Sequence, residues 1–248
     1  MTLWQMEWAR LFRTRRWIAL AAGFMFFGLI GPIVTRYQRE LFKSLGGGIK
    51  VIIPVPTPPD GIASYVKNAS QIGLVVLVVV AAASLAIDAK PEWSSFLRTR
   101  ARSTWSLIAP RFAVNAVAGV VAFIVGALAA WYETAVLIGG VSVGAMVLGI
   151  VYGALYLAFV VAVVAFATGL TRSTVGAIGV ALVVLVLLPL LGSVPVFEPW
   201  VPSRLVGALD GLVRGASAAD YSRSAAVTVA LSVAALWGTA RLTARREL

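Results

Sequence analysis

The sequence predicts an all-α integral membrane protein, and three observations support this fold class. Hydrophobic residues make up 60% of the 248-residue chain and charged residues only 12%, whereas soluble domains contain about 45–50% apolar residues. Several stretches of about 18 or more residues carry almost no charge, and an α-helix needs this length to cross a bilayer. The short alternating segments typical of membrane β-barrels are absent.

Hydropathy, with a mean of +0.93, places six membrane-spanning helices. They cover residues 17–34, 70–87, 106–131, 136–166, 174–191 and 224–240. The fourth stretch is longer than a bilayer requires, so we expect this helix to tilt, bend or emerge from the membrane. We expect a single membrane domain over residues 1–248, and the even number of spans places both termini on the same side.

The positive charges predict the orientation. The net charge is +11, but the cations flank apolar spans, which indicates topology and headgroup contacts rather than nucleic-acid binding. With the N-terminus inside, the inner segments are shorter and carry more Lys and Arg than the outer ones. The positive-inside rule therefore favours a multi-pass protein of the cell (cytoplasmic) membrane with both termini in the cytoplasm.

The segments between the spans differ in character. Residues 1–16 predict an interfacial helix, because Trp4, Trp8, Leu11 and Phe12 recur on one face while Glu7, Arg10 and Arg13 lie away from it. Residues 35–69 predict an outer loop, since their prolines and glycines exclude a regular helix through the middle. Residues 192–223 predict an outer segment that dips into the leaflet or forms short helices on it.

The densest cluster of cations lies between the second and third spans, in "PEWSSFLRTRARSTWSLIAPR" at residues 91–111. Pro91 and Glu92 suit the first turn of a helix, and Trp93, Phe96 and Leu97 then fall on one face. We expect a short amphipathic helix within a cytoplasmic loop at residues 88–105. From its residues alone, the helix is either a membrane anchor or a surface for a partner protein.

Two pairs of glycines at a spacing of four occur within and just before the fourth span, and they would allow close helix packing. They are Gly140 with Gly144 and Gly149 with Gly153. Packing within the chain and packing between subunits are both compatible with this pattern.

Motifs for catalysis are missing from the sequence. The chain contains no Cys and no His, which excludes disulfides, the usual zinc and haem sites, and His-based acid–base mechanisms. The stretch "GGGIK" at residues 46–50 lacks the spacing of a phosphate-binding loop. We therefore expect no enzyme activity, metal or cofactor in this chain. The predicted spans also contain almost no ionisable residues, so any transport would draw its energy from another subunit.

Three stretches resemble the permease subunits of ABC-2 type (type V exporter-like) ABC transporters. They are "EWARLFRTRRWIAL" at residues 7–20, the outer loop, second span and cytoplasmic loop at residues 52–114, and "EPWVPSRLVGAL" at residues 198–209. In that family the loop after the second span is a coupling helix that sits in a groove of a separate ATPase. The resemblance implies coupling positions at Asp88, Lys90, Glu92, Trp93, Phe96, Leu97, Arg98 and Arg100, with Arg111 as the cation entering the third span.

The resemblance further implies a function and partners. The chain would be the permease of an ATP-driven exporter of lipophilic drugs, peptides or lipids. Its partners would be an ABC ATPase that binds ATP and Mg, a second permease copy or a homologue, and membrane lipids. The alternative is a stand-alone membrane scaffold or pore that has no ATPase partner.

Overall fold

The computed structural model describes residues 2–45, 54–86, 103–171 and 173–244. Within these ranges every regular element is helical and there is no strand, which confirms the all-α class. Six of the helical segments found there are long and apolar enough to cross a membrane, as predicted. They are Arg16–Phe42, Pro58–Leu85, Thr104–Leu137, Val143–Thr171, Thr174–Gly192 and Ala218–Ala244.

The helices differ widely in length along the chain. The N-terminal helix α1 (Leu3–Arg13) leads through a tight turn into α2 (Arg16–Leu45). The second span consists of α3 (Pro58–Asn68), a π-helical turn η1 (Ala69–Gly73) and α4 (Leu74–Leu85). Further along are α6 (Thr104–Leu137), α7 (Val143–Thr171), α8 (Thr174–Gly192), η2 (Glu198–Trp200), η3 (Pro202–Gly207), α9 (Ala208–Val213), η4 (Ala218–Tyr221) and α10 (Ser222–Ala244).

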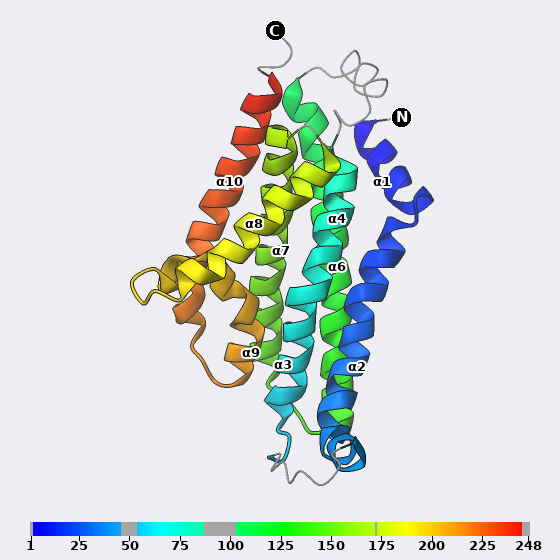
Figure 1. Cartoon of the computed structure of the whole chain (residues 1–248), viewed down its shortest axis with the longest axis vertical. Helices are drawn as coiled ribbons and strands as arrows, with labels where there is room; N and C mark the ends of the chain where they lie inside the picture. Colours follow the sequence, from blue (N-terminus) through cyan, green and yellow to red (C-terminus); the bar gives the residue numbers. More distant parts are fainter. Residues whose placement is uncertain (1, 46–53, 87–102, 172, 245–248) are drawn as a thin grey trace.

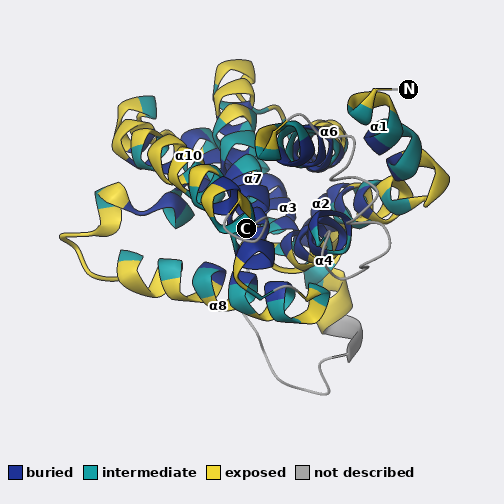
Figure 2. Ribbon diagram, turned by 90° about the horizontal axis from the view of Figure 1, so that it is seen from above, coloured by how far each residue is buried: buried dark blue, intermediate teal, exposed yellow. Residues whose placement is uncertain are grey.

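The long helices run mostly lengthwise, and the start of α1 and the end of α10 lie at the same end of the molecule (Figure 1). Helix α7 is central. It packs against α4, α6, α8, α9 and α10, and it is largely buried in the view along the long axis (Figure 2). Helix α2 packs chiefly against α6, while α8 crosses the other helices obliquely with much of its surface exposed (Figures 1 and 2).

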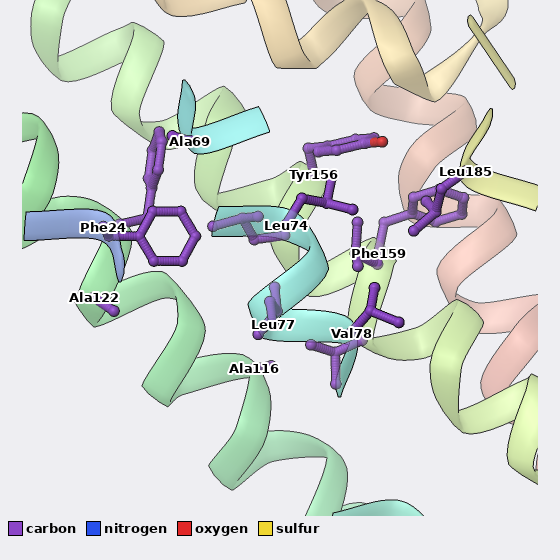
Figure 3. Close-up of a cluster of buried hydrophobic side chains, with 14 of the residues drawn as sticks. Phe24, Ala69, Leu74, Leu77, Val78, Ala116, Ala122, Tyr156, Phe159 and Leu185 are labelled. Carbon is purple, nitrogen blue, oxygen red and sulfur yellow. The ribbon is translucent and has the colours of Figure 1, made fainter. Parts of the chain in front are cut away.

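The core is apolar and includes an aromatic group where α2, α3 and α6 meet. The Phe24 and Phe123 rings meet edge to face with centroids 6.0 Å apart, and Tyr65 stacks on Phe123 at 5.8 Å. The Tyr65 hydroxyl donates a 2.8 Å hydrogen bond to the Phe123 carbonyl, which satisfies a buried polar group. Leu74, Leu77 and Val78 of α4 extend the core toward Tyr156 and Phe159 of α7 (Figure 3).

Two ends of predicted segments differ from the structure. Helix α2 continues to Leu45, and α3 begins at Pro58, so residues 35–69 are helical on both sides of the undescribed stretch rather than a loop throughout. The prolines start a helix instead of breaking one. Pro58 and Pro59 occupy the first turn, where a missing N–H costs nothing, and Asp60 caps the helix by accepting hydrogen bonds from Thr57.

The boundary between the third and fourth spans also differs from the predicted one. Val136 was predicted to start the fourth span, but it belongs to α6, which ends at Leu137. Helix α7 begins at Val143, after a connection in which Gly139 has a φ of 152°. The residues on both sides of this short connection are strongly hydrophobic. Hydropathy alone therefore does not show where α6 ends and α7 begins.

Residues 192–223 contain the short helices η2, η3, α9 and η4, and their predicted position on the outer leaflet stays a prediction. Leu205 and Leu209 pack inward and are almost fully buried beside α7, whereas Val196, Phe197 and Trp200 are exposed. Several of these helices begin with a proline or a capping Ser, as at Pro202 and Ser217.

Candidate functional site

Helix α1 buries one charged residue, Glu7, against the rest of the protein. Glu7 and Leu11 are buried at 4% and 6% exposure, whereas Trp4 and Phe12 are exposed and Trp8 is half-buried. The predicted face of Trp4, Trp8, Leu11 and Phe12 is therefore divided. Glu7 was predicted away from that face, yet it lies one turn from Leu11 on the side that contacts α6.

The partner of Glu7 is Arg111, on the first half of α6. The Arg111 Nε donates a 2.9 Å hydrogen bond to Glu7 Oε1, and both side chains are about 95% buried. Removing either charge would leave the other without its ion-pair partner in a dry environment. This ion pair joins residues more than one hundred positions apart in sequence, so it fixes α1 against the third span.

The end of α4 adds neutral polar groups to the ion pair. The Asn115 Nδ2 donates to Ser84 Oγ at 2.9 Å and to the Arg111 carbonyl at 2.8 Å. Both Asn115 and Ser84 are buried. Arg10 also reaches this region, with its Nη1 3.6 Å from Glu7 Oε2 and 3.5 Å from the Ser84 carbonyl. We call Glu7, Arg10, Arg16, Arg111, Ser84 and Asn115 the charge cluster.

Arg16, the first residue of α2, completes the charge cluster. The charges of Glu7 and Arg10 both act on it. Its Nη1 is buried and has no hydrogen-bond partner in the part of the chain that the structure describes. Among the described residues Glu7 is the only carboxylate that forms an ion pair with a member of the cluster, and it does so with Arg10 and Arg111. Among the described residues, the cluster thus has three guanidinium groups and one carboxylate.

The sequence contained a signal for this cluster that the prediction missed. Arg111 lies inside the predicted third span, and an ionisable residue inside a span is by default a functional or structural site. It was taken only as a cation entering the helix. Glu7 gave a weaker signal, since nothing in a single amphipathic helix identifies which polar residue faces the protein.

The predicted coupling residues, Asp88, Lys90, Glu92, Trp93, Phe96, Leu97, Arg98 and Arg100, lie outside the described residues. The charge cluster includes residues from both flanking helices, Ser84 near the end of α4 and Arg111 near the start of α6. It therefore borders the two points at which the chain enters and leaves that segment.

A second ion-pair site lies at the opposite end of the molecule, between α3 and α9 (Figure 1). Arg214 donates to Asp60 at 2.9 Å and to Asp210 at 2.8 Å. These groups are partly exposed. The hydrogen bond from Arg214 to Asp60 raises the pKa of Arg214 above its ordinary value, with a further contribution from Asp210.

Comparison with known proteins adds one relative. No family model matches the chain, and no solved structure matches it. The "Uncharacterized transmembrane protein YxlG" of Bacillus subtilis (strain 168) is 22% identical over 178 residues, which cover 71% of this chain and 67% of YxlG. Both this distant homologue and the six apolar helices indicate a protein that crosses the membrane several times. The chain is a multi-pass membrane protein.

In this membrane protein, the exposed apolar side chains have an immediate explanation. Val183, Val186, Leu187 and Leu190 of α8 are half or more exposed, and in a bilayer such side chains are in contact with lipid or with another subunit. These side chains are therefore not exposed to water, and their position has no cost in free energy.

The glycine pairs have different environments. A Cβ on Gly149 would lie 2.6 Å from the Leu209 Cα, and one on Gly153 would lie 2.6 Å from the Phe123 ring. These two glycines pack within the chain. A Cβ on Gly144 or on Gly140 would meet no atom of the described residues within 4 Å. Gly140 also precedes α7 and is not helical. Gly140 and Gly144 therefore do not form the predicted helical pair.

A small apolar pocket beside η1 lies between α2, α6 and α7. Its walls include Phe24, Ser70, Phe123, Tyr156 and Leu157. The lining has few polar groups and no charged side chain, so it does not suit bond-making chemistry.

Proposed function

We propose that this membrane protein is the permease subunit of an ABC transporter and that a separate ATPase energises it. The chain has no GxxxxGK[ST] motif of its own, so ATP and Mg would bind to the partner. The protein would act with a second permease, as a homodimer or with a homologue.

The observation that carries the proposal is the position of the charge cluster. The sequence on both sides of it, residues 7–20 and 52–114, resembles the ABC-2 permeases. The Glu7–Arg111 ion pair joins α1 to the first half of α6, and Ser84 links the end of α4 to the same residues. A push on the segment between α4 and α6 would then move these helices together with α1 as one unit.

Transport would follow from this rigid connection. Closure of the ATPase would act on the coupling helix of each permease, and the two permeases would alternately expose a path between them to the two sides. The direction of export comes from the family resemblance. The scarcity of charges in the spans favours lipophilic cargo, such as drugs, lipids or apolar peptides.

The first experiment is an affinity purification of this chain from its native host in mild detergent, with mass spectrometry of the proteins that accompany it. We expect a near-stoichiometric protein that contains GxxxxGK[ST]. An extract in which other ABC complexes survive serves as the control. If the chain is recovered alone from that extract, the stand-alone scaffold or pore is the better explanation.

The second experiment tests the coupling helix. We expect that Arg98→Glu and Arg100→Glu, combined with Phe96→Ala and Leu97→Ala, abolish stimulation of the ATPase while the permease is still inserted, because aromatic and Arg contacts dominate such grooves. The matched control reverses the exposed Arg13 and Arg15 instead. ATPase stimulation that is unchanged in the quadruple variant would restore the membrane-anchor interpretation.

A further inference from the structure

Among the described residues, the charge cluster holds three guanidinium groups and a single carboxylate, and this imbalance points to a ligand. Glu7 is shared between Arg111 at 2.9 Å and Arg10 at 3.6 Å. The charge of the same carboxylate also acts on Arg16, but Arg16 forms no ion pair among the described residues. Burying uncompensated positive charge is costly, so an additional anion close to Arg10 and Arg16 would stabilise the folded protein.

The two arginines at the edge of the cluster remain accessible. Arg111 is buried behind Glu7, whereas the Arg10 side chain is 35% exposed and Arg16 is half-buried. The Arg16 Nη1 is buried and has no hydrogen-bond partner among the described residues. An anion would therefore reach the cluster from the side of Arg10 and Arg16.

An aromatic surface lies at the turn between α1 and α2, where Trp17 directly follows Arg16 in the sequence. At the turn between α1 and α2, Phe12 contacts Trp8 with ring centroids 6.2 Å apart and Trp17 at 6.1 Å. Phe12 and Trp17 are exposed. Aromatic residues of this kind are typical of the membrane–water interface, where they lie at the level of the headgroups. A cationic site next to exposed aromatic rings matches a molecule with an anionic head and an apolar body.

We propose that Arg10 and Arg16 bind the phosphate of an anionic phospholipid, whose glycerol and upper acyl region lies on Phe12 and Trp17. The lipid would supply the negative charge that Glu7 alone does not provide, and it would hold the turn between α1 and α2 at the membrane surface. This site does not depend on the ATPase partner of the proposed function.

The test measures the thermal stability of the purified full chain in phosphatidylcholine nanodiscs, with and without phosphatidylglycerol. We expect phosphatidylglycerol to raise the Tm of the wild type. Arg16→Gln should remove most of this rise and weaken phosphatidylglycerol binding about fivefold, because one cation near an anionic surface contributes about a factor of that size. Arg16→Lys should retain most of the rise because it keeps the charge.

Arg13→Gln is the matched control, since Arg13 is exposed at the end of the preceding helix α1, three residues from Arg16, and its removal changes the net charge equally. We expect it to respond to phosphatidylglycerol like the wild type. Inorganic phosphate added to phosphatidylcholine nanodiscs separates the two sources of the anion, and it should raise the Tm much less than the lipid. An equal rise with phosphate would replace the lipid by a free anion at the same arginines.

The proposal is wrong if phosphatidylglycerol raises the Tm of Arg16→Gln and of the wild type equally, or if it has no effect on the wild type. Because Arg16→Gln could disturb folding, its Tm in pure phosphatidylcholine is compared first. Counting bound lipids by native mass spectrometry provides a second readout that does not depend on that Tm.

Discussion

At the scale of single residues, the Glu7–Arg111 ion pair makes the sharpest prediction. Glu7→Gln leaves the Arg111 guanidinium buried at 4% exposure without its counter-charge, so we expect a loss of about 3–5 kcal/mol in the free energy of unfolding. Unfolding in mixed detergent micelles measures it. The control is Glu198→Gln, which removes an ion pair to Arg204 that is 3.9 Å long and partly exposed, and this should cost about 0–1 kcal/mol.

The ion pair also predicts non-additivity. In Glu7→Met combined with Arg111→Met no charge of the pair remains unpaired, so we expect the double variant to unfold at a higher denaturant concentration than either single variant. If the two losses simply added, Glu7 and Arg111 would not act as a pair, and each would contribute through separate contacts.

At the scale of helices, α7 allows two glycines to be compared directly. Gly149→Ala would place a Cβ 2.6 Å from the Leu209 Cα, so α9 must move, and we expect a loss of about 1–3 kcal/mol. Gly144→Ala on the same helix meets nothing within 4 Å and should be neutral or stabilise by up to about 1 kcal/mol through helix propensity. Equal losses would contradict the close packing of α7 against α9.

The helices themselves were predictable, because long apolar runs must be helical in a bilayer. The residues at which the helices begin and end were less predictable. The prolines at positions 58 and 59 are compatible with both a loop and a helix start, and only the capping by Asp60 distinguishes the two. The Glu7–Arg111 contact could not be predicted because it depends on how α1 turns back along α6. The rotation of a short helix about its axis is set by its tertiary neighbours.

At the scale of the whole molecule, two ion-pair sites fasten opposite ends with different exposure. Arg214 and Asp60 are 45% and 38% exposed, whereas the Glu7 and Arg111 side chains are 4% and 5% exposed. Salt screens exposed charges far more than buried ones. We therefore expect high ionic strength to increase hydrogen–deuterium exchange in α9 and the first turn of α3 but not in α1.

This difference is measured on one sample at low and high salt, with the middle of α7 as the internal reference. Equal acceleration in α1 and α9 would mean that water reaches Glu7 and Arg111, contrary to their burial. The comparison also bears on the proposed function, because rigid coupling through α1 requires that its attachment to α6 resist such conditions.

The π-helical turn η1 has a consequence for the history of this chain. The Leu74 N–H donates to the Ala69 carbonyl five residues earlier, so this turn contains one residue more than an α-helical turn. Each later residue of α4 is consequently rotated by about 100° relative to an uninterrupted helix. A relative with one residue fewer at this point would still present the same apolar face to α7. The turn therefore has the form of a single-residue insertion that the fold absorbed without changing either end of the span.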